Sequence, residues 1–261
     1  MCYDGKVFCL ITGGSRGFGR AVALAFAGSC NFTAGSVMVL TGRSEADLQE
    51  TKIQVENVNS KIVIKIEVFD LGDMAALESF TSKLPNFGKS FDSAILINNA
   101  GSLGDISKKL TSPSSYEDLK KYFDFNVVSV CMLIQHFFNA FKSTRKVIVN
   151  VSSLAAINQM PYLSLYCTAK AARDMLHKAL ACEEEGARVL NYAPGPMETA
   201  MSMDIQQNIG DLQTREFFKG LRETRKIIDP AESAEKLVQL LKTDKYGSGD
   251  HIDFYDVEKH V

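Results

Sequence analysis

The 261-residue sequence has no CxxC pair, no excess of charge of either sign and no apolar run long enough to cross a membrane. Its six cysteines, which include Cys2, are irregularly spaced, so we expect reduced thiols in place of a zinc site or a disulfide framework. The 29 basic and 31 acidic residues nearly cancel, which argues against nucleic-acid and anionic-membrane partners. The four histidines lack metal-ligand spacing, and the first 25 residues show no targeting segment. These absences predict a soluble, cytoplasmic globular protein without a metal.

Short apolar runs alternate along the chain with helical patterns. The runs are Lys6–Thr12, Ser36–Thr41, Lys61–Phe69, Ser93–Asn98, Lys146–Val151, Arg188–Tyr192 and His251–Tyr255. The helical patterns are Phe18–Ser29, Glu45–Asn57, Asp73–Leu84, Ser115–Lys142, Leu163–Glu185 and Ala231–Lys242. This alternation predicts an α/β fold: a single domain over residues 1–261, Rossmann-type and doubly wound, with a seven-stranded parallel sheet flanked by helices. Residues 194–230 break the alternation as a polar, Met-rich insertion, which we expect to cover the substrate at the carboxyl edge of the sheet.

A glycine-rich turn follows the first predicted strand and opens the first predicted helix. Residues 12–19 read Thr-Gly-Gly-Ser-Arg-Gly-Phe-Gly. Glycines here permit a tight turn and let backbone amides approach a pyrophosphate at the helix N-terminus. A purely structural turn could have the same composition, but its place between strand and helix favours a dinucleotide site. The predicted cofactor-binding residues of this turn are Gly13, Gly14, Ser15, Arg16, Gly17, Phe18 and Gly19.

The end of the second predicted strand indicates which dinucleotide binds. An acidic residue there favours NAD, whereas a basic residue accommodates the 2′-phosphate of NADP. The sequence reads Gly42-Arg43-Ser44, with no acid before Glu45. Taken alone, Arg43 could be an ordinary surface charge at a helix start. Together with Arg16 in the glycine turn, it predicts NADP(H), bound by Arg43 and Ser44.

A serine, a tyrosine and a lysine are spaced so that they converge. Tyr166 and Lys170 stand four residues apart on a predicted helix and share one face, while Ser153 follows the strand that ends at Val151. Ser153 would hydrogen-bond a carbonyl oxygen, Tyr166 would donate the proton, and Lys170 would favour the phenolate of a tyrosine whose unassisted pKa is about 10. Each residue alone also fits a structural role: a core tyrosine, a solvated lysine, a cap for a turn. Their combination with the glycine turn predicts a carbonyl reductase.

Over essentially its whole length the chain resembles the short-chain dehydrogenase/reductase family. The matching segments are Thr12–Gly19, Asp70, Asn98–Gly101, Asn126, Ser153, Tyr166 with Lys170, and Pro194-Gly195. The resemblance implies that Asn126 supports a proton relay through water and that Lys170 also holds the nicotinamide ribose. It further implies cofactor contacts for Asp70, Leu71, Asn98, Ala100, Gly101, Met197, Glu198, Thr199, Ala200, Met201 and Ser202.

Within the family, segments such as Leu165–Met175 and Asp253–Asp256 resemble reductases that act on the side-chain keto groups of pterins, toward tetrahydrobiopterin, as homodimers. The resemblance implies substrate contacts for Ser153, Leu154, Tyr166, Gly195 and Asp253. Side chains alternate along a strand, so we expect Ile252 and Phe254 to face the core while Asp253 and Tyr255 point away. The Asp253 carboxylate would then accept N–H groups from the guanidine-like edge of a pterin, although a solvated acid would also fit the sequence.

Two other functions remain open at this point: a reductase of other dicarbonyl substrates, and a non-catalytic NADP(H) sensor. The intact serine, tyrosine and lysine argue against the sensor, because sensing requires none of them. For the homodimer we expect an interface built from the helices at Ser115–Lys142 and Leu163–Glu185. The first of these carries an apolar stripe, which would otherwise be buried within the monomer, made of Val127, Val128, Val130, Met132, Leu133 and Phe137.

Overall fold

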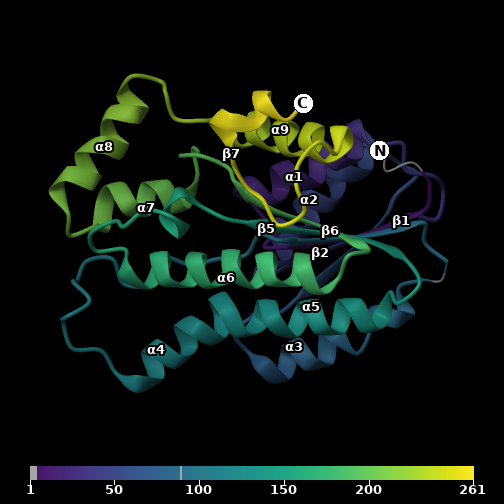
Figure 1. Ribbon diagram of the computed structural model, residues 1–261, viewed down its shortest axis with the longest axis horizontal. Helices are drawn as coiled ribbons and strands as arrows, with labels where there is room; N and C mark the ends of the chain where they lie inside the picture. Colours follow the sequence, from purple (N-terminus) through teal and green to yellow (C-terminus); the bar gives the residue numbers. More distant parts are fainter. Residues whose placement is uncertain (1–4, 89) are drawn as a thin grey trace.

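The computed structural model describes residues 5–88 and 90–261, so Cys2 lies outside the described residues. Its sheet has seven strands, all parallel, in the order β3-β2-β1-β4-β5-β6-β7, which confirms the predicted fold class (Figure 1). The strands are β1 (Val7–Thr12), β2 (Val37–Gly42), β3 (Val63–Val68), β4 (Ser93–Asn98), β5 (Arg145–Val151), β6 (Ala187–Ala193) and β7 (His251–Asp253).

Helices cover both faces of the sheet (Figure 1). One face carries α1 (Gly17–Ser29), α2 (Glu45–Val58) and α9 (Pro230–Thr243), and the other carries α3 (Met74–Thr81), α5 (Ser129–Ala140) and α6 (Ser164–Glu183). Because both faces are covered, every residue of β1 and β4 is buried, and their sequences are nearly continuous apolar runs. The edge strand β3 has only one strand neighbour and keeps several exposed side chains.

The order of the strands reverses direction between β1 and β4. The chain runs from β1 outward through β2 to β3, and then crosses back to place β4 on the other side of β1. In doubly wound folds, the crevice at such a reversal is where ligands bind, at the carboxyl ends of the strands. The glycine turn follows β1 and the Asn98–Gly101 segment begins at the end of β4, so both predicted cofactor segments lie at this crevice.

The prediction of one continuous helix over Ser115–Lys142 is wrong. The structure has α4 (Tyr116–Phe123), a π-helical turn at Asp124–Val128, and then α5. The turn contains neither glycine nor proline, so nothing in the local sequence indicates the break. The predicted helix Asp73–Leu84 also ends early, with α3 followed by a 3-10 helix at Leu84–Asn86, because Pro85 has no N–H to continue an α-helix.

The insertion at residues 194–230 contains two helices that the sequence analysis did not predict. They are α7 (Ala200–Asn208), capped by Thr199, and α8 (Leu212–Glu223), capped by Asp211. Both lie beyond the carboxyl ends of the strands, at the left of Figure 1. The apolar side chains Phe217, Phe218 and Leu221 share one face of α8, but no residue of the helix is buried, because this face lines the cavity and not a core.

The last strand is shorter than predicted. It ends at Asp253, and residues Phe254–Lys259 form a 3-10 helix. Asp253 starts this helix, because its Oδ1 accepts a hydrogen bond from the backbone N–H of Tyr255 at 3.0 Å. The expected alternation nevertheless holds, since Ile252 and Phe254 are buried and Tyr255 is 61% exposed.

The apolar stripe predicted for the dimer interface is exposed only in part. Val130, Leu133 and Phe137 pack into the protein's own core against the sheet. Val128 remains 39% exposed on the same segment.

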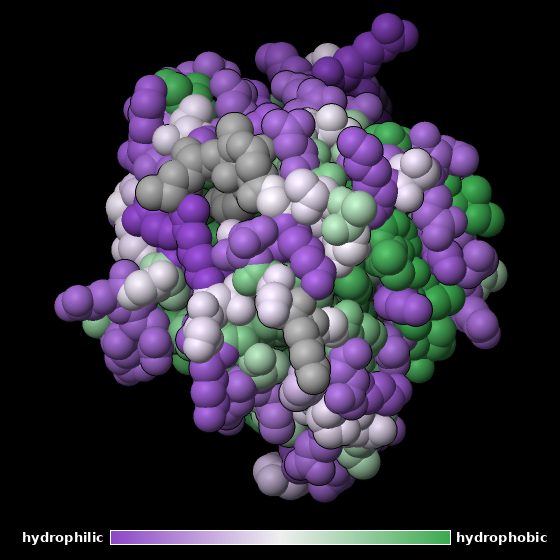
Figure 2. All heavy atoms as spheres, turned by 90° about the vertical axis from the view of Figure 1, so that its right-hand side faces the viewer, coloured by the Kyte–Doolittle hydropathy of each residue, from purple (hydrophilic) through white to green (hydrophobic). Residues whose placement is uncertain are grey.

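The end of the molecule at the amino ends of the strands is largely hydrophilic, with hydrophobic residues gathered toward one side of the view (Figure 2). Within residues 5–88 and 90–261, no helix combines the length and the apolar character needed to cross a membrane.

Candidate active site

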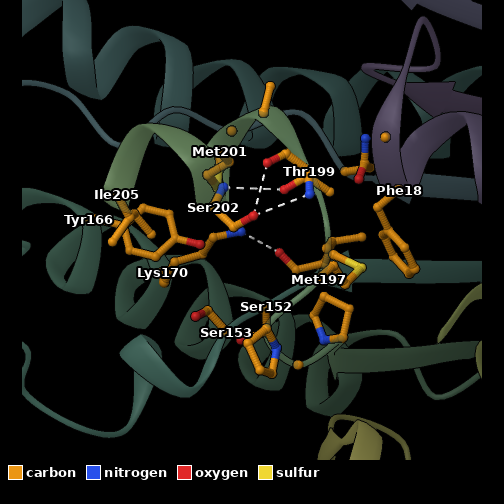
Figure 3. Close-up of a pocket in the computed structure, with 18 of the residues that line it drawn as sticks. Phe18, Ser152, Ser153, Tyr166, Lys170, Met197, Thr199, Met201, Ser202 and Ile205 are labelled. Atoms are coloured by element: carbon orange, nitrogen blue, oxygen red, sulfur yellow. Dashed lines mark hydrogen bonds between the residues drawn. The ribbon is translucent and has the colours of Figure 1, made fainter. Parts of the chain in front are cut away.

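A cavity of about 1600 Å³ opens at the carboxyl ends of the strands. The glycine turn and the segments that follow β2, β4, β5 and β6 form its base, and α7 and α8 close one side. Figure 3 shows Tyr166, Lys170 and Ser153 in this pocket together with Thr199 and Ser202 of the α7 start. One continuous cavity therefore holds the predicted catalytic and cofactor segments.

The glycine turn adopts a conformation that favours glycine. Gly13 and Gly17 have positive φ angles of 67° and 55°. A Cβ on Gly19 would lie 2.1 Å from the carbonyl oxygen of Gly13, so the start of α1 packs directly on the turn. The side chain of Asn99 secures this arrangement by donating hydrogen bonds to the carbonyl oxygens of Thr12 and Gly13, at 2.8 and 3.1 Å. Asn99 lines the cavity and was absent from the predicted site residues.

The first turn of α1 fits a phosphate. Its N-cap residue, Arg16, makes no side-chain hydrogen bond to the helix, and the first turn contains no acidic residue. The backbone amides there consequently have no side-chain cap, which is the arrangement that binds anions at a helix N-terminus. The residues present thus suit the pyrophosphate of a dinucleotide.

Arg43 extends from the end of β2 and lines the cavity beside the glycine turn. Its guanidinium lies 3.7 Å from the Asp70 carboxylate, and the two side chains are 72% and 45% exposed. An ion pair this exposed contributes little stability, so Arg43 can exchange Asp70 for a phosphate at small cost. Asp70 itself does not line the cavity, and its Oδ1 accepts a hydrogen bond from Gly72 N–H at 2.8 Å.

Tyr166 lies on α6 with its side chain half-buried in the cavity wall next to Ser153. Burial raises the pKa of Tyr166, whereas a hydrogen bond with Ser153 and the positive charge of Arg173 lower it. Ser153 begins a 3-10 helix after β5, and its Oγ also accepts a hydrogen bond from Ala155 N–H at 3.2 Å. Ser153 therefore caps the turn that follows β5 and also lines the cavity.

Lys170 follows one turn later on α6 and is buried. Its Nζ donates a hydrogen bond to the Val151 carbonyl oxygen at 2.5 Å and lies 5.5 Å from the centre of the Tyr166 ring. Burial and the neighbouring Arg173 charge hold the pKa of Lys170 well below its usual range, and Asp174 opposes them. The expectation that Lys170 supplies the charge favouring the phenolate therefore needs a second contributor, Arg173, which the sequence analysis did not assign.

Asn126 lies in the π-helical turn between α4 and α5. Its Oδ1 accepts a hydrogen bond from Ser102 N–H at 2.9 Å, and its Nδ2 donates to the Tyr122 carbonyl oxygen at 3.0 Å. Gly101 faces this amide: a Cβ there would meet Asn126 Oδ1 and Lys170 Nζ at 3.8 Å each. Gly101 therefore lies between the Asn126 amide and the Lys170 ammonium group, and the role of Asn126 in a water relay remains a prediction.

Arg173 and Asp174 extend the site beneath the cavity, and both are buried. The guanidinium donates to the carbonyl oxygens of Asn98 and Ala100 and, at 2.8 Å, to Asn150 Oδ1. Burial lowers the pKa of Arg173 to about 10. Because Asn150 also donates to Asp174 at 2.9 Å, one amide connects the two charges. The sequence does contain a signal for this pair: Arg173 and Asp174 stand three and four residues after Lys170, on the same face of the helix.

The substrate end of the cavity is mostly apolar. Its apolar wall comes from the η3 region, the start of α6 and the insertion helices: Leu154, Ile157, Met160, Leu163, Ile205, Phe217, Phe218 and Leu221. Asp253 at the end of β7 lines the same cavity and brings a carboxylate to this wall.

Most of the predicted site residues line this one cavity, and four do not. Gly14 donates its N–H to Thr41 O at 2.9 Å, behind the turn. Asn98 is buried against His177, and Asn126 and Asp70 have the partners given above. The roles assigned to these residues remain predictions.

The sequence pattern of the short chain dehydrogenase family matches residues 7–210, and the chain belongs to this family of NAD(P)(H)-dependent oxidoreductases. It is 36% identical to a sepiapterin reductase of Rattus norvegicus over 258 residues, covering 97% of this chain and 98% of the relative. It is 37% identical to that of Xenopus tropicalis over 256 residues, with 97% of each chain covered. A crystal structure of a short chain dehydrogenase/reductase from Saccharomyces cerevisiae has the same fold, with a TM-score of 0.82, 24% identity, and 98% and 100% of the two chains covered.

Proposed function

We propose that this protein is an NADPH-dependent carbonyl reductase that acts on the side-chain keto groups of pterins such as sepiapterin. The observation that carries the proposal is the cavity, which holds Ser153, Tyr166 and Lys170 at one place and the Asp253 carboxylate at another. The identity with sepiapterin reductases extends over almost the whole chain, including the insertion and β7, and supports the same substrate class.

In this proposal each polar side chain has one task. Ser153 donates a hydrogen bond to the substrate carbonyl oxygen, and Tyr166 donates the proton as the oxygen becomes an alcohol. Lys170 would favour the resulting phenolate when it is charged, and the positive charge of Arg173, which already lowers the pKa of Tyr166, favours it as well. Asp253 accepts N–H groups of the ring and so orients the planar substrate. The bound nicotinamide supplies the hydride, and Met197, Glu198, Thr199, Ala200, Met201 and Ser202 would cover it.

We also propose the domain organisation, the cellular compartment and the pathway of this protein. Residues 1–261 would form one NADP(H)-binding domain, with the insertion at 194–230 covering the substrate, in the cytoplasm and in the last steps toward tetrahydrobiopterin.

Steady-state kinetics of the purified protein test the proposed function directly. We expect a higher kcat/KM for sepiapterin than for 2,3-butanedione or benzil, with NADPH as reductant. Reduction of the diketones without sepiapterin would identify a dicarbonyl reductase instead. Tight NADPH binding without turnover of any carbonyl would identify a nucleotide sensor.

The cofactor preference is a separate prediction, carried by Arg16, Arg43 and the absence of an acid at the end of β2. We expect Arg43→Ala to raise the KM for NADPH about tenfold, since a charge-assisted hydrogen bond is worth about 1.5–3 kcal/mol. The KM for NADH should hardly change. Lys52→Ala, which removes a half-buried positive charge paired with Glu56 on α2, is the matched control. Equal use of NADPH and NADH by the wild type would contradict the preference.

We also predict a homodimer in which α4, α5 and α6 meet a second copy. Met175 on α6 is 65% exposed, and Val128 in the π-helical turn between α4 and α5 is 39% exposed. Light scattering at micromolar protein should give twice the chain mass of 28.7 kDa. Met175→Glu should shift the mass toward one chain, whereas Ile53→Glu, at a 49% exposed site on α2, should not. A single-chain mass for the wild type would contradict the prediction.

A further inference from the structure

A buried hydrogen bond joins the helix that carries the predicted proton donor to the last strand of the sheet. Tyr166, Lys170 and Asp174 follow one another at intervals of four residues, so they share one face of α6. Asp174 Oδ2 lies 2.6 Å from Nδ1 of His251 on β7, and the two side chains are 5% and 10% exposed. Since a carboxylate only accepts, Nδ1 carries the proton of this contact. The face of α6 that bears the predicted catalytic residues therefore also holds β7.

The Asp174 carboxylate is itself fixed in place. Its Oδ1 accepts hydrogen bonds from Ser152 Oγ at 2.5 Å and from Asn150 Nδ2 at 2.9 Å, so the group cannot turn away from His251 without losing them. Nε2 of His251 is buried and has no hydrogen-bond partner among residues 5–88 and 90–261. The polar contact that the imidazole makes through Nδ1 is thus directed at the helix and not at a ligand.

Asp253 depends on this contact for its position. Strand β7 has three residues and lies at the edge of the described sheet, where it pairs with β6. His251 and Asp253 stand on the same side of β7, because Ile252 between them is buried in the core. Holding His251 against α6 consequently sets the place of the Asp253 carboxylate, which lines the cavity, relative to Tyr166.

The spacing between Asp253 and Tyr166 matters for the proposed reaction. A rigid planar ring bound at Asp253 presents its side-chain carbonyl to Tyr166 only when the two residues keep one distance. A misplacement of about 1 Å at a reacting group can lower a rate by about 10²-fold. A small diketone is not bound at Asp253, so its reduction does not depend on this distance.

We propose that Asp174 is a positioning residue for substrate recognition, which acts through His251 to hold Asp253 at a fixed distance from Tyr166. The inference rests on the proposed pterin reductase function. It adds the contact by which the recognition group on β7 and the proton donor on α6 are kept at the spacing that one substrate requires.

The variant His251→Leu removes the donor to Asp174 and leaves an apolar side chain in its place. We expect kcat/KM for sepiapterin to fall about tenfold, and no further than removal of the Asp253 charge would lower it. The KM for NADPH and kcat/KM for 2,3-butanedione should remain as in the wild type. His251→Asn should restore the sepiapterin value, since its amide can donate to Asp174 from the position of Nδ1. His260→Leu, outside the cavity lining, is the matched control and should change none of these values.

A double-mutant cycle separates positioning from a general loss of stability. In the Asp253→Asn enzyme, His251→Leu should change kcat/KM for sepiapterin by less than about twofold, because no recognition charge is left to position. Additive losses, an equal loss with both carbonyls, or no recovery in His251→Asn would overturn the inference while leaving the proposed function in place. Absence of sepiapterin turnover by the wild type would overturn both.

If His251→Leu fails to fold, hydrogen exchange of the His251 Nδ1 proton in the wild type decides, measured by NMR on protein labelled with nitrogen-15 at histidine. Sepiapterin bound at Asp253 should restrain β7, and so slow this exchange, in enzyme saturated with NADP. Addition of 2,3-butanedione should leave the exchange rate unchanged. An exchange rate that sepiapterin does not alter overturns the inference.

Discussion

Replacing Tyr166 by phenylalanine should lower kcat for carbonyl reduction by about 10²–10⁴-fold, the usual contribution of a positioned general acid. The phenol is the group beside Ser153 that can deliver a proton to the substrate oxygen, and its surroundings are arranged around that proton. Burial holds the pKa of Tyr166 above its ordinary value, so the proton is retained at neutral pH. The hydrogen bond with Ser153 and the Arg173 charge favour its departure when the substrate oxygen accepts it.

The fold should tolerate this change, because phenylalanine keeps the ring that packs with Leu163 and Ile205. Binding of NADPH, measured by fluorescence titration, should therefore remain as in the wild type. Tyr162→Phe, which removes a hydroxyl in the same cluster but outside the cavity lining, is the matched control and should keep normal turnover. A near-normal kcat for Tyr166→Phe would remove this residue from the mechanism.

Asp253→Asn should lower kcat/KM for sepiapterin by about 10–100-fold, the effect of losing about 1.5–3 kcal/mol for a hydrogen bond to a charged group. The structure makes this a clean substitution, since asparagine retains an oxygen that can accept the Tyr255 N–H and start the 3-10 helix. The lost property is the negative charge facing the ring donors of the substrate. Turnover of 2,3-butanedione, which has no such donors, should hardly change.

Asp256→Asn is the matched control for Asp253→Asn. Asp256 lies three residues further on and also lines the cavity, but its carboxylate is paired with Lys259 at 2.5 Å. We expect a small effect from the control. If Asp253→Asn reduces turnover of both substrates equally, Asp253 stabilises the end of β7 and does not recognise the pterin.

The fold could be predicted from the sequence where a local pattern, such as a continuous apolar run or a glycine-rich turn, reflects the packing around it. Residues of β1 and β4 are continuously apolar because helices cover both sheet faces, and the glycines of residues 13–19 are required by positive φ angles and close contacts. The π-helical turn at Asp124–Val128 has no such signal, because its residues suit an ordinary helix equally well. Helix α8 has no buried residue. Its apolar side chains line the cavity and do not pack into a core.

The site could be predicted residue by residue only where a family motif exists. Tyr166, Lys170 and Ser153 have recognisable spacing, whereas the partners of Asp174 come from β5, from the residue that follows β5, and from β7, and they meet only in the folded chain. Arg173 illustrates the same difficulty. A buried arginine is satisfied here by carbonyl oxygens at the end of β4, and backbone acceptors leave no trace in the sequence.

The reversal of strand order at β1 and β4 also determines when the site can form during folding. A parallel sheet has no hairpins, so each strand pairing closes a long loop and contributes to slow, non-local folding. The pairing of β1 with β4 is the most distant of these, and at its edge Lys6 N–H reaches Asp92 across 86 residues. Asn99 secures the glycine turn only after that loop has closed. A partly folded chain with all its helices would consequently still lack the dinucleotide crevice.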